Sequence, residues 1–154
     1  MEITLANLSD PRIIDLLNTH LMTAQAQTAP GSDHALDLIG LQSPEISLWA
    51  VWERESLLGV GALKRLSAAH GEVKSMHTAK TKRRAGVGSL MLRHIIATAR
   101  ASGLSRLSLE TGSWDYFDPA RRFYASHGFV ECPPFAEYVA DPNSVFMSLD
   151  LRPA

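Results

Sequence analysis

The chain has 154 residues, of which 45% are hydrophobic and 20% charged, enough for one domain with a real core. Its 15 basic and 16 acidic residues give a formal net charge of −1. The chain therefore lacks the excess of basic residues that sequence-independent binding of nucleic acid requires. No apolar run approaches the roughly 20 residues of a membrane helix, and the N-terminal residues show no signal-peptide pattern. The single cysteine, Cys132, cannot form an internal disulfide. We therefore expect one cytoplasmic domain over residues 1–154.

The first half of the chain is predicted to hold a strand, a long helix and three more strands. Alternating apolar residues predict a strand over residues 2–7. Ser9, Asp10 and Pro11 combine capping side chains with a proline, which predicts a helix from there to about residue 27. Residues 35–41 are expected to form one further turn. The further strands are predicted over residues 46–52, 57–66 and 72–78, the first two as a hairpin.

The second half is predicted to alternate helices and strands. Apolar residues at helical spacing predict a helix over residues 86–102, which Arg100 and Gly103 end. A buried strand over 104–110 and a short helix over 119–127 follow. Strands over 129–131 and 145–151 complete the chain. This order predicts an α/β or α+β fold with a central mixed sheet.

The segment from residue 72 to residue 89 is predicted to bind an anion, because it joins a strand to a helix through a glycine-containing loop. The first turn of a helix has free N–H groups and a partial positive charge, and glycine lets the backbone approach a phosphate closely. Lys80, Lys82, Arg83 and Arg84 concentrate positive charge beside this turn. A diphosphate is the expected ligand. The alternative is a solvated connection without a ligand.

Three phosphate-binding motifs can be compared with this loop. A P-loop needs Gly-x-x-x-x-Gly-Lys-Ser/Thr, and nothing in the sequence fits. A dinucleotide fingerprint needs a third glycine after Gly86 and Gly88, where Met91 stands, although Glu110 ends the next strand as its ribose-binding acid would. The third motif, Gln/Arg-x-x-Gly-x-Gly/Ala, is matched at every fixed position by residues 83–88.

The third motif resembles the coenzyme A pyrophosphate loop of the GCN5-related N-acetyltransferase (GNAT) superfamily. Residues 72–78 resemble its fourth strand, and residues 120–129 resemble its Ala-x-x-Phe/Leu-Tyr-x-x-x-Gly-Phe segment. The similarity is strong over residues 57–131, and the element order fits the whole chain. The resemblance implies a central mixed, mostly antiparallel sheet of about seven strands flanked by helices, with the fourth and fifth strands splayed apart.

The sequence departs from the family pattern at four places. Arg84 stands where members usually have glycine, and Ala85 where they often have a basic residue. Residues 78–80 lack the common Val-x-Pro, and Thr111 stands where many members have asparagine. These departures concern the detailed phosphate and pantetheine contacts rather than the fold.

The resemblance implies acetyl-CoA as the co-substrate, with no metal. The pantetheine arm would lie between the splayed strands and hydrogen-bond to the backbone of Met76 and Thr78. An N–H near Met76 would hold the thioester oxygen and its oxyanion. The implied cofactor-binding residues are Met76, His77, Thr78, Arg83, Arg84, Ala85, Gly86, Val87, Gly88, Ser89 and Thr111.

Two residues match catalytic positions of the family. Tyr124 matches the tyrosine that protonates the departing thiolate as general acid; its alternative is a tyrosine at the edge of the core. Glu72 falls where some members carry a general-base glutamate. Its alternative is a structural carboxylate that pairs with Lys74 or Arg106, with water chains serving as the base. His77 is a candidate for a second proton carrier.

No motif identifies the residues that would contact the acceptor, and the candidates come from their positions in the chain. His20 and His34 lie where the family shapes its acceptor pocket, and Trp114 and Asp115 belong to the long connection after the fifth strand. Asp118, next in that connection, would either attract a cationic amine or cap the helix that follows. The six histidines show no metal-ligand spacing.

The sequence thus predicts an acetyl-CoA-dependent N-acetyltransferase that acts on a small-molecule amine by direct attack in a ternary complex. Two alternatives stay open: a non-catalytic acyl-CoA-binding module on the same fold, and a nicotinamide-nucleotide oxidoreductase suggested by Gly86, Gly88 and Glu110. No nucleic acid or membrane partner is expected, and a homodimer is left open.

Overall fold

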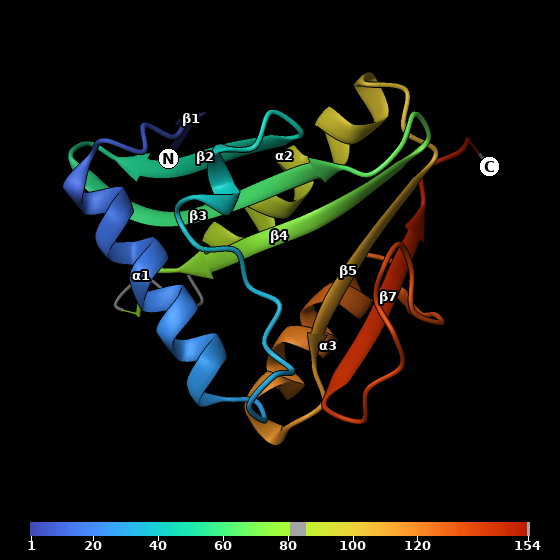
Figure 1. The fold of residues 1–154 in the computed structure, drawn as a ribbon. Coiled ribbons are helices and arrows are strands. Elements are labelled where there is room, and N and C mark those ends of the chain that lie inside the picture. The colour runs from blue at the N-terminus through green and yellow to red at the C-terminus, as the bar shows by residue number, and fades with distance from the viewer. Residues whose placement is uncertain (81–85, 154) are drawn as a thin grey trace.

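The computed structural model describes residues 1–80 and 86–153, which form one seven-stranded sheet with helices on both faces (Figure 1). The strand order is β1-β2-β3-β4-β5-β7-β6. β4 and β5 pair in parallel, and the other described neighbours are antiparallel. The elements are β1 (Glu2–Leu5), α1 (Pro11–Ala26), a 3-10 helix (Gly40–Gln42), β2 (Ile46–Glu53), β3 (Ser56–Arg65), β4 (His70–Thr78), α2 (Val87–Ala101), β5 (Arg106–Gly112), a second 3-10 helix (Asp115–Phe117), α3 (Asp118–Ser126), β6 (Val130–Glu131) and β7 (Ser144–Asp150).

The sheet separates two hydrophobic cores. Ile13 and Leu17 of α1 pack with Leu48 and other side chains from one face of β2 and β3. Met91 and Ile95 of α2 pack on the opposite face, together with the inward side chains of β4, β5 and β7. Figure 1 shows α1 in front of the sheet and α2 and α3 behind it. A side chain of the sheet therefore faces either α1 or the α2–α3 layer.

Local sequence signals fix the ends of the two long helices. The Asp10 side chain accepts a hydrogen bond from the Arg12 N–H, and Pro11 is the first residue of α1, as the capping pattern predicts. Gly86 is the N-cap of α2 with a φ of 82°, a left-handed conformation that glycine adopts without a steric penalty. Gly103, just beyond the other end of α2, has the same φ.

Two irregularities open the centre of the sheet. In the β3–β4 ladder, Val60 pairs with His77 and Ala62 pairs with Lys74, so that Gly61 alone faces Ser75 and Met76. This is a β-bulge, and Ser75 in it has a φ of 54°. β4 and β5 pair only from His70 to Glu72, although both strands continue beyond these residues. Beyond Glu72 the two strands therefore diverge, as the sequence resemblance implied.

The predicted elements agree with the observed ones to within a few residues, and the mixed, mostly antiparallel sheet with splayed central strands is confirmed. The predicted capping role of Asp118 is wrong, because Asp118 is the first residue of α3 and its carboxylate forms ion pairs with Arg121 and Arg122. Within the described residues, no helix combines the length and the apolar character needed to span a bilayer.

Candidate functional site

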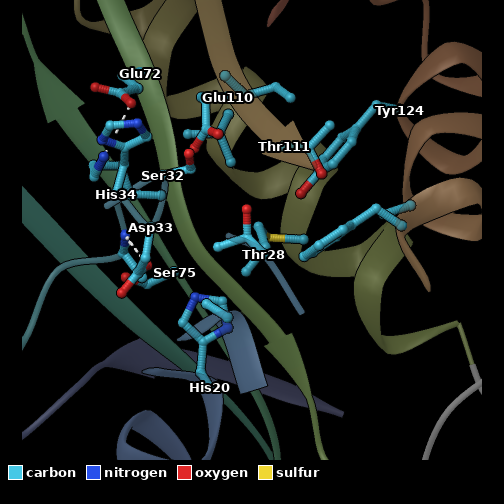
Figure 2. A pocket seen from close by; sticks show the side chains of 18 residues that line it. His20, Thr28, Ser32, Asp33, His34, Glu72, Ser75, Glu110, Thr111 and Tyr124 are labelled. Atoms are coloured by element: carbon cyan, nitrogen blue, oxygen red, sulfur yellow. Dashed lines mark hydrogen bonds and ion pairs between the residues drawn. The ribbon is translucent and has the colours of Figure 1, made fainter. Parts of the chain in front are cut away.

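A cavity of about 160 Å³ lies where β4 and β5 diverge. Its walls come from α1, the loop that follows α1, β4, β5 and α3. The loop after α1 is fixed over the opening by a hydrogen bond of 2.6 Å from the Ser32 hydroxyl to the Asp141 carboxylate. Figure 2 shows polar side chains from all these segments around one space. The irregular centre of the sheet thus creates the site.

Side chains from both faces of the sheet line the cavity, and its two ends differ chemically. Leu107 and Leu109 of β5 pack in the core on the α2 side, so the alternation of a strand places Glu110 on the opposite, α1 side. Glu72 lies on that side also, because its neighbour Val73 packs toward α2. Tyr124 of α3 reaches the cavity from the α2–α3 layer (Figure 2).

On the α1 side, Glu72 belongs to a closed polar network. Its Oε2 accepts hydrogen bonds from Lys74 Nζ at 3.0 Å and from the Tyr138 hydroxyl at 2.6 Å. Lys74 Nζ also donates to the Tyr138 oxygen at 2.9 Å, and the His34 ring packs edge-on against the Tyr138 ring. The Glu72 and Lys74 side chains are only 3% and 9% exposed, so each charge depends on the other for compensation. The structural pairing that the sequence left open for Glu72 is therefore present.

Glu110 is the second carboxyl group at this end. It lines the cavity and forms no ion pair with another described residue. Burial raises the pKa of Glu110 to about 7, and the negative charges of Glu72 and Asp33 add to the rise. The Ser144 hydroxyl and Lys74 oppose it, although the Ser144 geometry falls short of a full hydrogen bond.

The bulge in β4 supplies polar groups in the middle of the cavity. Ser75 has the left-handed backbone conformation that side-chain-bearing residues seldom adopt, and such strain is concentrated at functional sites. Its hydroxyl is buried and has no hydrogen-bond partner in the described chain, and the same holds for Thr28 Oγ1 across the cavity. A ligand in the cavity would satisfy both groups.

Tyr124 presents its phenol from α3. Its ring packs against the core near Phe123 and Phe129, and its hydroxyl makes no hydrogen bond to another described residue. Burial raises the pKa of Tyr124 above its usual value, which keeps the phenol protonated. Phe117 lines the cavity beside it and lies so close to Gly112 that any side chain there would collide with the ring.

His20 and His77 form a pair between α1 and β4. Their Nδ1 atoms lie 3.1 Å apart, so one ring donates and the other accepts. Burial lowers the pKa of His20 to about 4, and the proximity of His77 and Lys74 contributes. His20 is therefore neutral at physiological pH.

The predicted anion site lies beside the α2 N-terminus. Gly88, in the first turn, comes close to Phe123 of α3 and to Thr78 at the end of β4, so these three elements meet there. Val87 is buried, and Ser89 is partly exposed in the same turn. Arg83, Arg84 and Ala85, also predicted to bind the cofactor, lie outside the described residues.

The structure brings six of the predicted site residues to one cavity. The residues that line it are His20, His34, Glu72, Met76, Thr111 and Tyr124. Trp114 and Asp115 do not line it, because the Trp114 indole N–H donates to Asn143 and Asp115 is exposed at the surface. Their predicted role in acceptor binding has no support from this geometry.

Several site residues were not predicted for this site. Tyr138 is distant in sequence from the other motifs, and no local pattern marks it. Glu110 was considered only as a ribose-binding acid, whereas the alternation of β5 between buried and polar residues could have placed it on the face of the sheet opposite to Leu109.

Among residues 1–80 and 86–153, no group of three or more His, Cys, Asp or Glu side chains is arranged to hold a metal ion.

The mixed sheet with a bulged β4 and a splayed β5 defines an acyl-CoA N-acyltransferase type of fold, and three comparisons agree with this class. Residues 14–129 match the model of the acetyltransferase (GNAT) family. The chain belongs to this family, and it is accordingly an acyltransferase. The alternative of a nicotinamide-nucleotide oxidoreductase is thereby overturned, and the mostly antiparallel sheet agrees.

Relatives of similar length are known. The protein named "uncharacterized N-acetyltransferase YsnE" from Bacillus subtilis (strain 168) is 48% identical over 98% of this chain and 100% of its own length. The IAA acetyltransferase of Azospirillum brasilense is 37% identical over 78% of each chain. A solved aminoglycoside 6'-N-acetyltransferase complexed with coenzyme A shares the fold with a TM-score of 0.72 at 14% identity, over 100% of this chain and 99% of the other.

Proposed function

We propose that the protein transfers the acetyl group of acetyl-CoA to the amine of a small molecule, by direct attack of the amine on the thioester in a ternary complex. The observation that carries the proposal is the cavity between the diverging strands, which side chains of α3 line on one side and side chains of α1 on the other. Two reactants approaching from opposite faces would meet at the Ser75–Met76 bulge.

Acetyl-CoA would occupy the α2 side. Its pyrophosphate would bind the N–H groups of the first turn of α2, at Gly86 to Ser89, where the helix dipole favours negative charge. The pantetheine arm would lie along the edge of β4 that β5 leaves unpaired beyond Glu72. Coenzyme A bound to the same fold in the aminoglycoside enzyme supports this role.

Tyr124 would act as general acid on this side. When the amine attacks the thioester carbon, the C–S bond breaks and the sulfur leaves as a thiolate, which needs a proton. The buried phenol remains protonated and has no competing partner among the described residues, so its proton is available to the sulfur. The N–H groups of the bulge near Met76 would stabilise the oxyanion.

The acceptor amine would enter from the α1 side, past His20 and His34. Among the described residues of this wall, the carboxyl groups of Asp33, Glu72 and Glu110 outnumber the one cation, Lys74, which favours a positively charged acceptor. The cavity volume is about 160 Å³, and we expect the acceptor to be a compact molecule. The expected compartment is the cytoplasm, since an unpaired Cys132 suits reducing conditions. A homodimer stays a prediction.

The proposal is tested by thiol release from acetyl-CoA in the presence of a panel of compact primary amines, with product masses read by mass spectrometry. We expect thiol release that depends on both enzyme and amine, with an acetyl group added to the nitrogen. The matched control omits the amine. Binding of acetyl-CoA without thiol release for any amine would contradict the proposal and favour a non-catalytic acyl-CoA-binding module.

A further inference from the structure

We propose that Glu110, rather than Glu72, is the general base that removes the proton from the acceptor ammonium, and that Glu72 positions β4 through its network with Lys74 and Tyr138. The inference rests on the proposed function, since a base is defined by the reaction it serves. It assigns a different role to each of the two carboxyl groups at the acceptor end of the cavity.

The position of Glu110 fits the path of the amine. Its side chain points from β5 into the cavity on the α1 side, opposite the side from which Tyr124 enters (Figure 2). A base must meet the nitrogen, whereas an acid must meet the sulfur on the other side of the carbonyl carbon. Glu110 and Tyr124 are therefore distributed over the two faces as the two proton transfers require.

The contacts of the two glutamates also favour Glu110 as the base. Glu72 is 3% exposed and its Oε2 already accepts hydrogen bonds from Lys74 and Tyr138. An ammonium that approached Glu72 would compete with a buried ion pair whose disruption is strongly unfavourable. Glu110 has no ion-pair partner in the described chain, so an incoming ammonium would be its first.

The surroundings of Glu110 also favour an exchange of protons. Burial raises the pKa of Glu110 to about 7, with Glu72 and Asp33 as nearby negative charges. A base with a pKa near the working pH combines a large ionised fraction with a useful affinity for the proton. A carboxylate with the ordinary pKa of about 4.3 would have a weaker affinity for the proton of an ammonium, whose pKa is about 10.

The proposed sequence of bonds is balanced. The ammonium gives one proton to Glu110, and the nitrogen lone pair attacks the thioester carbon. The tetrahedral intermediate collapses, the C–S bond breaks, and the thiolate takes the Tyr124 proton. The second proton lost by the nitrogen restores the Tyr124 phenol through water, and Glu110 releases its proton to solvent. The sum is amide, thiol and one proton.

The test compares wild type, Glu110→Gln and Glu72→Gln by thiol release with the best primary amine of the panel, between pH 6.5 and pH 9. We expect Glu110→Gln to lose about 10²-fold or more in kcat near pH 7, the usual contribution of a general base. The loss should shrink as the pH rises and free amine accumulates. The change in unfolding temperature caused by acetyl-CoA should be the same as in wild type.

Glu72→Gln should behave as a positioning variant. We expect a lower unfolding temperature and a loss of rate that is equal at every pH. Glu131→Gln, at an exposed position of β6, is the matched control and should leave both properties unchanged.

The outcomes separate this inference from the proposed function. Glu110→Gln with the rate and pH profile of wild type, or a pH-dependent loss in Glu72→Gln instead, would overturn the assignment of the base alone. A wild-type protein that releases no thiol with any amine would overturn the proposed function and this inference with it.

Discussion

The Tyr124 hydroxyl faces the cavity without a hydrogen-bond partner among the described residues, so Tyr124→Phe removes a proton donor and little else. We expect kcat to fall roughly 10²–10⁴-fold, in the range of a lost general acid. Acetyl-CoA affinity and the unfolding temperature should stay close to wild type, because the ring remains packed. Steady-state kinetics and an acetyl-CoA titration provide the measurement. An unchanged kcat would remove Tyr124 from the mechanism.

The raised pKa of Glu110 also predicts how the free energy of unfolding depends on pH in the absence of substrate. Its folded pKa of about 7 lies above the unfolded value, so the folded state binds the proton more tightly. This contribution makes the free energy of unfolding fall as pH rises from about 4.5 to 7, by at most about 3 kcal/mol. His20, whose pKa is lowered to about 4, acts oppositely and adds stability as pH rises toward 6.5.

The difference between wild type and Glu110→Gln isolates the first contribution, because His20 is present in both. We expect the variant to gain stability relative to wild type as pH rises from 5 to 8, measured by urea unfolding. A difference that is constant over this range would contradict the raised pKa of Glu110.

At the scale of elements, the ion pair between Lys74 and Glu72 ties β4 to the connection between β6 and β7 through Tyr138. Lys74→Met leaves a buried carboxylate without its cation, which destabilises by about 3–5 kcal/mol. The double variant Lys74→Met/Glu72→Gln should recover most of this loss, because no charge is then buried. Chemical unfolding of the two variants checks the expectation, and equal stabilities would show that the pair is not coupled.

The start of α2 allows a matched pair of glycine substitutions. Gly86 and Gly103 flank the same helix with the same φ of 82°, and a Cβ added at either position would meet no neighbouring atom within 4 Å. Alanine at either position should therefore destabilise by a similar amount, about 1–2 kcal/mol. Only Gly86→Ala should weaken acetyl-CoA binding, since Gly86 lies at the proposed pyrophosphate site. Calorimetric titration of both variants provides the measurement; equal affinities would place the pyrophosphate elsewhere.

The elements themselves were largely predictable, because each carries a local signal. Asp10 and Pro11 start α1, Gly103 ends α2, and apolar periodicity identifies the strands between them. The exception at Asp118 has a physical reason: two arginines within one turn offer its carboxylate ion pairs that compete with capping.

The site was predictable only in part. His20 and His34 were expected near the acceptor and Tyr124 near the thioester sulfur, and all three line the cavity. The network of Glu72 with Tyr138 depends on residues 66 positions apart in sequence, and only the folded chain brings them together. The outward position of Trp114 depends similarly on a hydrogen bond to Asn143, which no local pattern reveals.

At the scale of the whole molecule, the proposed function depends on a sheet that opens to hold acetyl-CoA. Ligand binding to the folded state stabilises it by about 2.7 kcal/mol at a hundredfold excess over the dissociation constant. For a domain of this size, that gain corresponds to a rise of roughly 5–10 °C in the unfolding temperature.

The most direct test of this claim is therefore thermal unfolding with and without acetyl-CoA, with NADH as the parallel control at the same concentration. We predict a clear rise in unfolding temperature with acetyl-CoA and none with NADH. No rise with acetyl-CoA at saturating concentration, or an equal rise with NADH, would contradict the claim.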